Sequence, residues 1–346
     1  MKHQTTRYGE IPFYKIGTFG NTADAFISKK LFLEYKTKYS FPKKGDILIS
    51  ASGTIGRTVI YDGKPAYFQD SNIVWIDNDE TLVKNDFLFY AYSNVKWNTE
   101  HTTILRLYND NFRNTLIPLP PLNEQIAIAN ILSGLDRYLY ALDALILKKE
   151  GVKKALSFEL LSQRKRLKGF NQAWQRVRLG DIANYLTSNL SVEQITQQGK
   201  IKVYDVNNFI GYTDTTFISD KPYISIVKDG SVGRVRILPP KTNILSTMGA
   251  LIANHRTTTE FLFYLLSNFD FKNFTSGSII PHIYFKDYKE KTIFLPPLNE
   301  QSAIANILSD LDNEITSLKN KKRQFENIKK ALNHDLMSAK IRVLKK

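Results

Sequence analysis

Hydrophobic and polar positions follow two different periods along this 346-residue chain, and the periods divide it into alternating parts. Apolar residues at steps of four and three run from Leu135 to Leu160 and again from Leu311 to Leu336. This spacing places them on one stripe of an α-helix and is typical of a coiled coil. The remaining stretches hold short apolar runs separated by Gly, Pro, Asn and Asp, which predict strands and turns. The pattern therefore predicts a strand-rich block followed by a long helix, twice.

Each helical stripe has eight positions, two of them lysine, and the second set follows the first at a constant offset. A helix of roughly 45 residues would be roughly 65 Å long at 1.5 Å per residue. Because a long helix must bury its apolar stripe, we predict an antiparallel pair with a pseudo-two-fold axis. The alternative is two solvated helices that pack only on their own domains. The stripes are Leu135, Leu139, Leu142, Ile146, Lys149, Lys153, Leu156 and Leu160, and Leu311, Ile315, Leu318, Lys322, Phe325, Lys329, Leu332 and Leu336.

The start of each helix is an almost exact repeat. Residues 119–136 and 295–312 differ at only two of eighteen positions. Both copies open with Pro-Pro, which ends a strand and suits the first turn of a helix. Glu124 and Glu300 follow near the helix start, where the helix dipole favours a negative charge. The chain is therefore a tandem of two units, each a variable block followed by the same segment.

The two variable blocks share landmarks as well. Glycine turns at 53–56 and 230–233 are each followed by an arginine, and Phe-Leu-Phe-Tyr occurs at 87–90 and 261–264. The first block has no match for Trp174–Ile182, so we expect it to lack an opening segment. The elements predicted in the first unit are strands at 11–16 and 67–76, a hairpin from 46–52 to 57–61, a short aromatic helix at 87–92 and a long helix at 122–168 closed by Gly169.

Composition narrows the setting of the protein. The absence of cysteine rules out disulfides and thiolate metal sites and fits a reducing cytoplasm. No apolar run approaches 18 residues and the N-terminus lacks the apolar core of a signal peptide, so we predict a soluble cytoplasmic protein with no membrane contact. Residues 137–169 and 313–346 contribute +6 and +7 of the net charge of +15. Those charges are either solvated helix faces or a basic surface for phosphates or an acidic subunit.

Sequence motifs for catalysis are missing. The chain contains no G-x-G-x-x-G, Walker A, H-E-x-x-H or G-x-S-x-G motif, and no Asn/Asp-Pro-Pro-Tyr/Phe tetrapeptide. Its five histidines are scattered, which argues against a metal cluster. We therefore predict no catalytic residues, no metal and no cofactor in this chain.

The two glycine turns have two readings. They are either plain hairpin turns, or loops that enter a DNA groove with Arg57 and Arg234 on guanine edges or phosphate. Under the second reading the candidate DNA contacts are Ser52, Gly53, Thr54, Gly56, Arg57, Lys228, Gly230, Ser231, Gly233 and Arg234.

A variable block followed by a Leu-Pro-Pro-Leu-x-Glu-Gln helix, twice over, resembles the specificity subunit of a type I restriction-modification system. The resemblance covers essentially the whole chain, except for the short N-terminus. It implies an α+β protein with two mixed α/β target recognition domains joined by two long antiparallel coiled-coil helices. The corresponding segments are a first recognition domain at 1–118, a helical spacer at 119–169, a second recognition domain at 170–294 and a second spacer at 295–346.

The same resemblance implies a non-catalytic subunit that recognises a bipartite double-stranded DNA target. Its expected partners are two methyltransferase subunits and the endonuclease/translocase subunits, which in the complex would carry out adenine methylation and ATP-dependent cleavage. The alternative is a helical scaffold for protein–protein assembly, which would not need two variable blocks of one fold. The expected partner contacts are Pro121, Leu122, Glu124, Gln125, Pro297, Leu298, Glu300 and Gln301.

Overall fold

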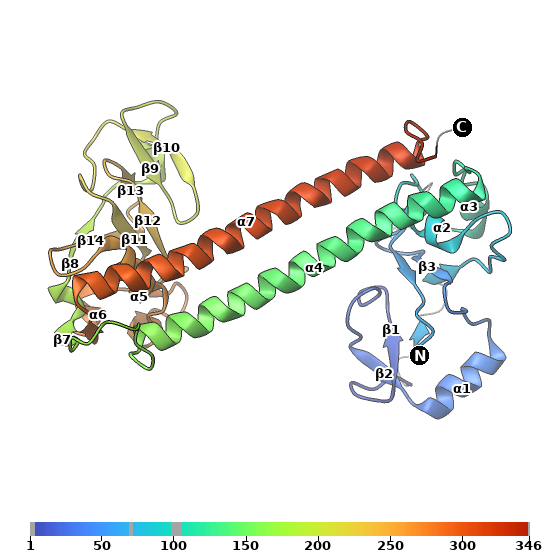
Figure 1. The fold of residues 1–346 in the computed structure, drawn as a ribbon, viewed down its shortest axis with the longest axis horizontal. Coiled ribbons are helices and arrows are strands. Elements are labelled where there is room, and N and C mark those ends of the chain that lie inside the picture. Colours follow the sequence, from blue (N-terminus) through green and yellow to red (C-terminus); the bar gives the residue numbers. More distant parts are fainter. Residues whose placement is uncertain (1–3, 69–71, 98–105, 345–346) are drawn as a thin grey trace. The chain divides into compact units, whose positions relative to one another are not determined.

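We describe a computed structural model of the chain over residues 4–68, 72–97 and 106–344 (Figure 1). The chain forms two compact units. Unit 1 comprises residues 1–143 and 320–346, and unit 2 comprises residues 144–319. Each unit contains one variable block and half of each long helix, because α4 (Leu122–Leu161) and α7 (Leu298–Met337) both pass from one unit into the other. The predicted division into four segments stays a prediction, because the boundary between the two compact units falls within both long helices.

Unit 1 is built on two three-stranded sheets, ordered β2-β1-β5 and β4-β3-β6. The central strand β3 is buried along its whole length. Helix α1 covers the first sheet through Phe32, and α2 packs on the second through Leu88. The elements are β1 (Ile11–Tyr14), β2 (Ala25–Ile27), α1 (Lys29–Lys38), β3 (Ile47–Ser50), β4 (Thr58–Ile60), β5 (Tyr67–Phe68), β6 (Ile73–Trp75), α2 (Asn85–Tyr92) and α3 (Asn109–Arg113).

Unit 2 repeats this plan with two additional strands at its start. Its main sheet has the order β12-β11-β14-β8, a second sheet has the order β10-β9-β13, and β17 pairs with β7. The elements are β7 (Gln175–Arg178), η1 (Leu179–Asp181), β8 (Ala183–Thr187), η2 (Val192–Gln194), β9 (Ile201–Tyr204), β10 (Phe209–Thr213), β11 (Tyr223–Val227), β12 (Val235–Leu238), β13 (Asn243–Ile244), β14 (Met248–Ala253), α5 (Thr259–Ser267), η3 (Lys272–Phe274), β15 (Thr275–Ser276), β16 (His282–Ile283), α6 (Phe285–Tyr288) and β17 (Thr292–Leu295).

The predicted hairpin and the aromatic helix of unit 1 are confirmed, as β3 pairs antiparallel with β4 and α2 spans Asn85–Tyr92. The predicted strand 67–76 is instead two strands, β5 and β6, and residues 69–71 lie outside the described part. The prediction that the first long helix continues to residue 168 is wrong, because α4 ends at Leu161. Gln163 adopts a left-handed conformation with φ of 62°, which no α-helix can continue through.

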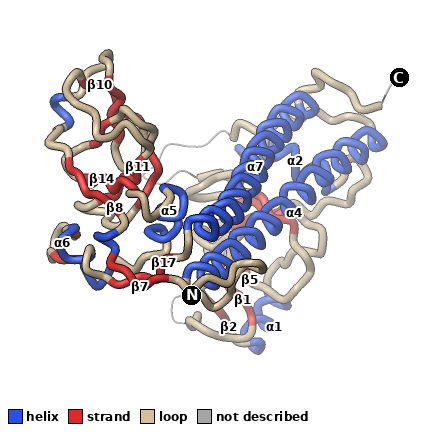
Figure 2. Tube along the Cα trace, turned by 60° about the vertical axis from the view of Figure 1, so that its left-hand side comes forward, coloured by secondary structure: helices blue, strands red, loops and turns tan. Residues whose placement is uncertain are grey.

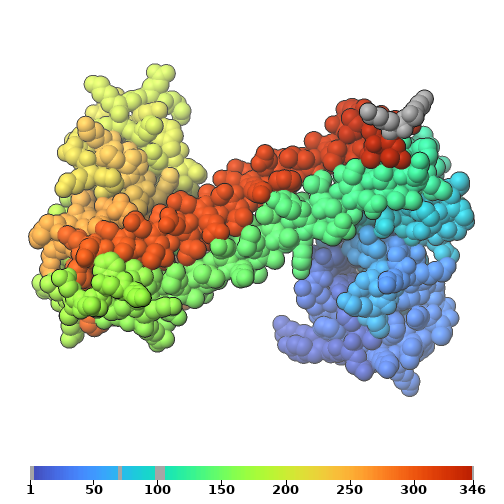
Figure 3. Space-filling view, viewed as in Figure 1, coloured from blue at the N-terminus to red at the C-terminus, as the bar shows by residue number. Residues whose placement is uncertain are grey.

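The long helices pack on each other within each unit, as predicted (Figure 2, Figure 3). In unit 1, Asp143 pairs with Lys322 at 2.6 Å and the Tyr138 ring lies 4.7 Å from that of Phe325. In unit 2, Lys149 donates to Glu314 at 2.8 Å. Along the pairs, the residue numbers increase on α4 and decrease on α7, so the two helices are antiparallel. The four seam lysines pair with carboxylates and so join the two helices: Lys149 with Glu314, Lys153 with Asp312, Lys322 with Asp143 and Lys329 with Asp136.

Candidate nucleic-acid interface

The glycine turn of unit 1 is the tight connection between β3 and β4. Gly53 and Gly56 have φ of 67° and 82°, a region that other residues rarely adopt. A side chain at Gly56 would lie 2.6 Å from Cδ1 of the Trp97 indole, so the backbone approaches that ring closely. Ser50 closes the turn, since its hydroxyl accepts from the Arg57 amide at 2.9 Å and donates to the Thr54 carbonyl. The turn leaves Gly53 and Thr54 exposed at its tip.

Unit 2 forms the same turn between β11 and β12. Gly230 and Gly233 have φ of 84° and 80°, and a side chain at Gly233 would lie 2.6 Å from Phe271. The Gly233 amide donates to the Val227 carbonyl at 2.9 Å, as the Gly56 amide does to Ser50 at 3.0 Å. Gly230 and Ser231 are exposed at the tip. Both glycine motifs are therefore tight hairpin turns, and their role in DNA binding stays a prediction.

The arginine after each turn contacts a neighbouring loop of its own unit. Arg57 Nη1 donates to the carbonyl of Phe19 at 3.0 Å, in the loop between β1 and β2. Arg234 Nη2 donates to Asn207 Oδ1 at 2.9 Å, in the loop between β9 and β10. Both arginines remain exposed, and a guanidinium has five N–H donors, so each keeps donors that face solvent.

A second loop lies beside the turn of unit 2. Gly230 donates to the carbonyl of Pro281 at 2.9 Å, and Asp229 forms an isolated bridge with His282. The Asp229 carboxylate also meets His282 Nδ1 at 2.6 Å. Ile279, at the tip of this loop, is 92% exposed. In unit 1 the equivalent bridge joins Ser52 to Arg106. The sequence patterns did not single out Asp229 and His282, because the two lie far apart in the chain and no local motif marks them.

The Glu-Gln pair at each helix start has partners inside the chain. Gln301 is fully buried; its amide nitrogen donates to the Arg256 carbonyl and its oxygen accepts from the Thr258 amide. Gln125 makes the equivalent contacts with the carbonyl of Leu82 and the amide of Lys84. These glutamines therefore join the start of each long helix to the segment that leads into α5 or α2.

The glutamates form ion pairs with arginines that sequence reasoning missed. Glu300 is fully buried and accepts from Arg166 at 2.6 Å and from the Trp174 indole at 2.9 Å. Glu124 meets Arg342 at 3.7 Å and the Val343 amide at 3.3 Å. Arg166 and Arg342 are separated by the same offset as the two helix starts, which is the signal that could have revealed them. The predicted partner contacts of Glu124, Gln125, Glu300 and Gln301 stay untested; their side chains serve the fold of this chain.

No group of three or more potential metal ligands occurs among the described residues. His3 and His101 lie outside that part. No described helix has the length and apolarity needed to cross a lipid bilayer.

The chain thus contains two mixed α/β units, and each has a glycine turn between two strands of its main sheet. Each unit also packs on the paired long helices, so this is a two-domain protein of duplicated architecture. The profile described as Type I restriction modification DNA specificity domain matches residues 1–149 and 171–327. The chain belongs to this family, and its resemblance to the specificity subunits of type I systems is confirmed.

Relatives agree with this assignment. A type I restriction enzyme specificity subunit from Haemophilus influenzae is 65% identical over 137 residues, which is 39% of this chain and only 36% of that protein's length. A specificity subunit of the MjaX enzyme from Methanocaldococcus jannaschii is 28% identical over 86% of this chain and 79% of the relative.

Solved structures share the fold. The S subunit of a type I restriction-modification system from M. genitalium has a TM-score of 0.64 at 20% identity, over 97% of this chain and 91% of that one. A chain from a structural study of complex assembly and conformational transition in a type I system has a TM-score of 0.56 at 16% identity, over 85% and 82%. The predicted fold class, two mixed α/β domains with long paired helices, is confirmed.

Proposed function

We propose that this chain reads a bipartite double-stranded DNA target, with one half-site contacted by each unit. One observation carries the proposal: the same glycine turn, with an exposed tip and an arginine anchored to a neighbouring loop, recurs in both compact units. A turn that only closed a hairpin would not need an anchored arginine after it in both units.

The chemistry of the turns suits a DNA groove. Small residues at the tips, Gly53 and Thr54 in unit 1 and Gly230 and Ser231 in unit 2, let the backbone approach bases and phosphates closely. Arg57 and Arg234 each have one donor held by the fold, which orients the guanidinium and lowers the entropy lost when it binds guanine. Ser52 forms the bridge to Arg106 in unit 1, and Lys228 lies beside the bridge between Asp229 and His282 in unit 2.

The surroundings of the two turns differ, which supports two different half-sites. The second loop of unit 2 carries His282 paired with Asp229, whereas unit 1 has Arg106 and Ser52 at the matching positions. Two units that contact different half-sites need the same fold with different side chains beside the glycine turn.

We also propose that the chain is non-catalytic and binds methyltransferase and endonuclease/translocase subunits. Among the predicted partner contacts, Leu122 and Leu298 are 39% and 47% exposed at equivalent places on α4 and α7, and Pro121 is exposed beside Leu122. Exposed apolar side chains at two equivalent positions fit two copies of one partner. The buried glutamates and glutamines would position these exposed residues rather than meet the partner themselves.

The test is an exchange of residues 174–292 for the equivalent block of a relative, in the chain assembled with its methyltransferase subunits. Sequencing of methylated DNA should show one half of the recognised motif changed and the other half kept. A change in both halves would contradict independent readers.

Single substitutions test the turns. Arg57→Ala and Arg234→Ala should each weaken binding of the cognate duplex by about 1–3 kcal/mol and relax one position of the motif. Arg323→Ala is the matched control, because Arg323 is exposed and bonds only to the nearby Asn320 among the described contacts. The scaffold interpretation would be favoured if all three variants bound the cognate duplex equally and the complex with the unaltered chain showed no sequence preference.

A further inference from the structure

In unit 2 the glycine turn between β11 and β12 is held by a second hairpin, formed by β15 and β16. Asp229 at the turn and His282 of β16 form an antiparallel bridge. Two backbone hydrogen bonds of 2.9 Å flank this bridge: Ile283 donates to Lys228, and Gly230 donates to Pro281. The ladder fixes the place of His282 beside the exposed tip of the turn.

The imidazole ring of His282 is bordered on three sides. Its Nδ1 lies 2.6 Å from Asp229 Oδ1. The Tyr284 ring lies nearly parallel to it, with centroids 6.5 Å apart and an angle of 20° between the planes. At the Cδ2 edge the chain turns at Gly277, which has φ of 88°, and a side chain there would lie 3.0 Å from Cδ2. The ring is therefore oriented by the fold before any ligand binds.

The contact with Asp229 also decides which ring nitrogen is the donor. A carboxylate oxygen only accepts hydrogen bonds, so the proton between the two groups belongs to Nδ1. In the neutral imidazole the other nitrogen, Nε2, is then an acceptor. Nε2 has no hydrogen-bond partner among the described residues, and the side chain is 36% exposed. His282 therefore offers one fixed acceptor to a ligand that contacts the turn.

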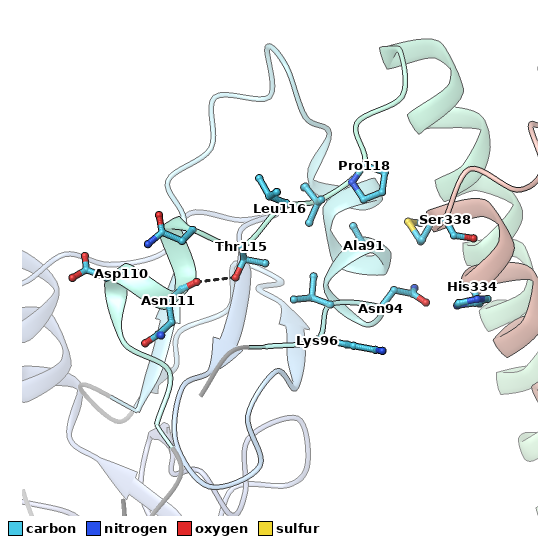
Figure 4. Close-up of a pocket in the computed structure, with 14 residues that line it drawn as sticks. Ala91, Asn94, Lys96, Asp110, Asn111, Thr115, Leu116, Pro118, His334 and Ser338 are labelled. Carbon is cyan, nitrogen blue, oxygen red and sulfur yellow. Dashed lines mark hydrogen bonds between the residues drawn. The ribbon is translucent and has the colours of Figure 1, made fainter. Parts of the chain in front are cut away.

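The other histidines of the described part are placed differently. His334 lines a cavity of about 580 Å³ at the end of α7 in unit 1 (Figure 4). Its Nε2 lies 3.5 Å from the Lys340 ammonium. His255 is exposed, and its ring forms no hydrogen bond with another described residue. Of the three, only His282 has a carboxylate that fixes its tautomer.

The corresponding position in unit 1 has the opposite hydrogen-bonding character. There the bridge beside the glycine turn joins Ser52 to Arg106. Arg106 is exposed, and a guanidinium only donates hydrogen bonds. The two units thus carry a donor and an acceptor at the same place beside their glycine turns. Base pairs differ in the major groove by their pattern of donors and acceptors, so this place suits a contact that distinguishes bases.

We propose that His282 is a specificity-determining residue of unit 2, whose Nε2 accepts a hydrogen bond from an exocyclic amino group in the major groove. Adenine N6 and cytosine N4 are the amino groups that base pairs present there. Asp229 holds the ring in the accepting tautomer. The inference rests on the proposed recognition of a half-site by unit 2, and it adds the chemical group that one position of that half-site carries.

A double-mutant cycle between the side chain and the amino group tests this inference, in the chain assembled with its methyltransferase subunits. Sequencing of methylated DNA first gives the recognised motif. Cognate duplexes are then made in which one adenine is replaced by purine, or one cytosine by 2-pyrimidinone, so that only the amino group is lost. With the unaltered chain, we expect one such replacement in the half-site of unit 2 to weaken binding by about three- to tenfold through the contact with His282.

Two substitutions of His282 separate base recognition from a structural role. In His282→Asn the amide nitrogen can donate to Asp229 as Nδ1 does, but nothing replaces Nε2. In His282→Gln the amide oxygen can take the place of Nε2, but the bond to Asp229 is lost. Loss of the amino group should therefore weaken binding by the Asn variant less than about twofold and by the Gln variant about threefold or more. A residue that only secured the loop would give the reverse order.

The inference would be overturned if no replacement weakened binding by the unaltered chain, if His282→Asn stayed as sensitive to the amino group, or if both substitutions abolished that sensitivity. Asp229→Asn, whose amide oxygen still accepts from Nδ1, should keep the sensitivity, and Asp229→Leu should reduce it. Equal sensitivity of these two variants would exclude the part assigned to Asp229.

Failure of the proposed function would give a different result. The complex with the unaltered chain would then bind the cognate duplex and an unrelated duplex equally, and the inference about His282 would fall with it. If the complex prefers the cognate duplex but the cycle shows no coupling to His282, only the inference about His282 is wrong.

Discussion

The clearest energetic prediction concerns a three-residue polar cluster that joins both long helices to the variable block of the same unit. In unit 2, Asp312 Oδ1 accepts from Lys153 at 2.5 Å and Oδ2 accepts from the Tyr264 hydroxyl at 3.0 Å. Unit 1 repeats the cluster, with Asp136 accepting from Lys329 and from Tyr90. Burial and the hydrogen bond to Asp312 raise the pKa of Tyr264, so this phenol stays a donor. The perturbation is Asp312→Asn, which keeps the shape and removes the charge.

The expected cost follows from the geometry. A hydrogen bond to a charged group contributes about 1.5–3 kcal/mol, whereas an exposed ion pair contributes about 0–1. The Lys153 and Asp312 side chains are 30% and 37% exposed, so the ion pair counts at the weaker end. An asparagine also turns an NH₂ group toward one of two donors. We therefore expect about 1–2 kcal/mol of local destabilisation, which is roughly a 5–30-fold change in the local opening equilibrium.

Hydrogen exchange of backbone amides is the assay, because a chain of two units need not unfold in one step. Asp312→Asn should speed exchange in α5 and leave α2 unchanged. Asp136→Asn should do the reverse, so each variant is the control for the other. If Asp312→Asn did not change amide exchange in α5, or changed exchange in α2 by the same amount, the cluster would not join the long helices to the variable block of unit 2.

Three further predictions follow from the same structure. Gly233→Ala should destabilise unit 2 by about 1–3 kcal/mol in denaturant unfolding, because a Cβ there would lie 2.6 Å from Phe271 at positive φ; Gly151→Ala, in open helix, is the control and should not destabilise. Burial raises the pKa of Tyr223 to about 12. Its contribution, about 2–3 kcal/mol, is complete below pH 10 and is lost as pH rises toward 12, so Tyr223→Phe should flatten the fall in stability over that range. Finally, one heptad inserted into each long helix, after Asp143 and after Lys319, preserves the pairing within each unit and lengthens each helix by about 10 Å. The unread gap in the methylated motif should widen by about three base pairs, and an active variant with the original gap would show that the helices do not set the spacing.

Periodicity along the sequence was sufficient for most of the architecture. The seam from Leu135 to Leu160, the glycine turns and the aromatic helix at 87–92 all depend on contacts between near neighbours in the chain, and such contacts leave a period or a turn residue behind. The duplication added independent support, since a pattern that recurs in the same order in both halves of the chain indicates a shared fold. Fold class and family were accessible for that reason.

The site was only partly accessible. The sequence pointed to Arg57 and Arg234, but their anchors in other loops, Phe19 and Asn207, carry no pattern that marks them. The hairpin turn at residues 230–233 could be predicted from the local sequence, whereas the bridge between Asp229 and His282 joins distant parts of the chain and depends on the fold.

Tertiary structure alone decided which polar residues are structural. In the sequence, the lysines of the helical stripe are unfavourable positions for a coiled coil. In the structure, Lys153 pairs with Asp312 of α7. In the sequence, Glu300 looks like a surface residue at a helix start. In the structure, Arg166 and Trp174 donate hydrogen bonds to its carboxylate. The sequence did not show the cavity of about 520 Å³ beside Trp97 and Ile117 in unit 1, because a cavity is a property of walls contributed by distant segments. Local patterns record what neighbours in the chain require, and long-range charge pairing and cavities are determined only when the chain has folded.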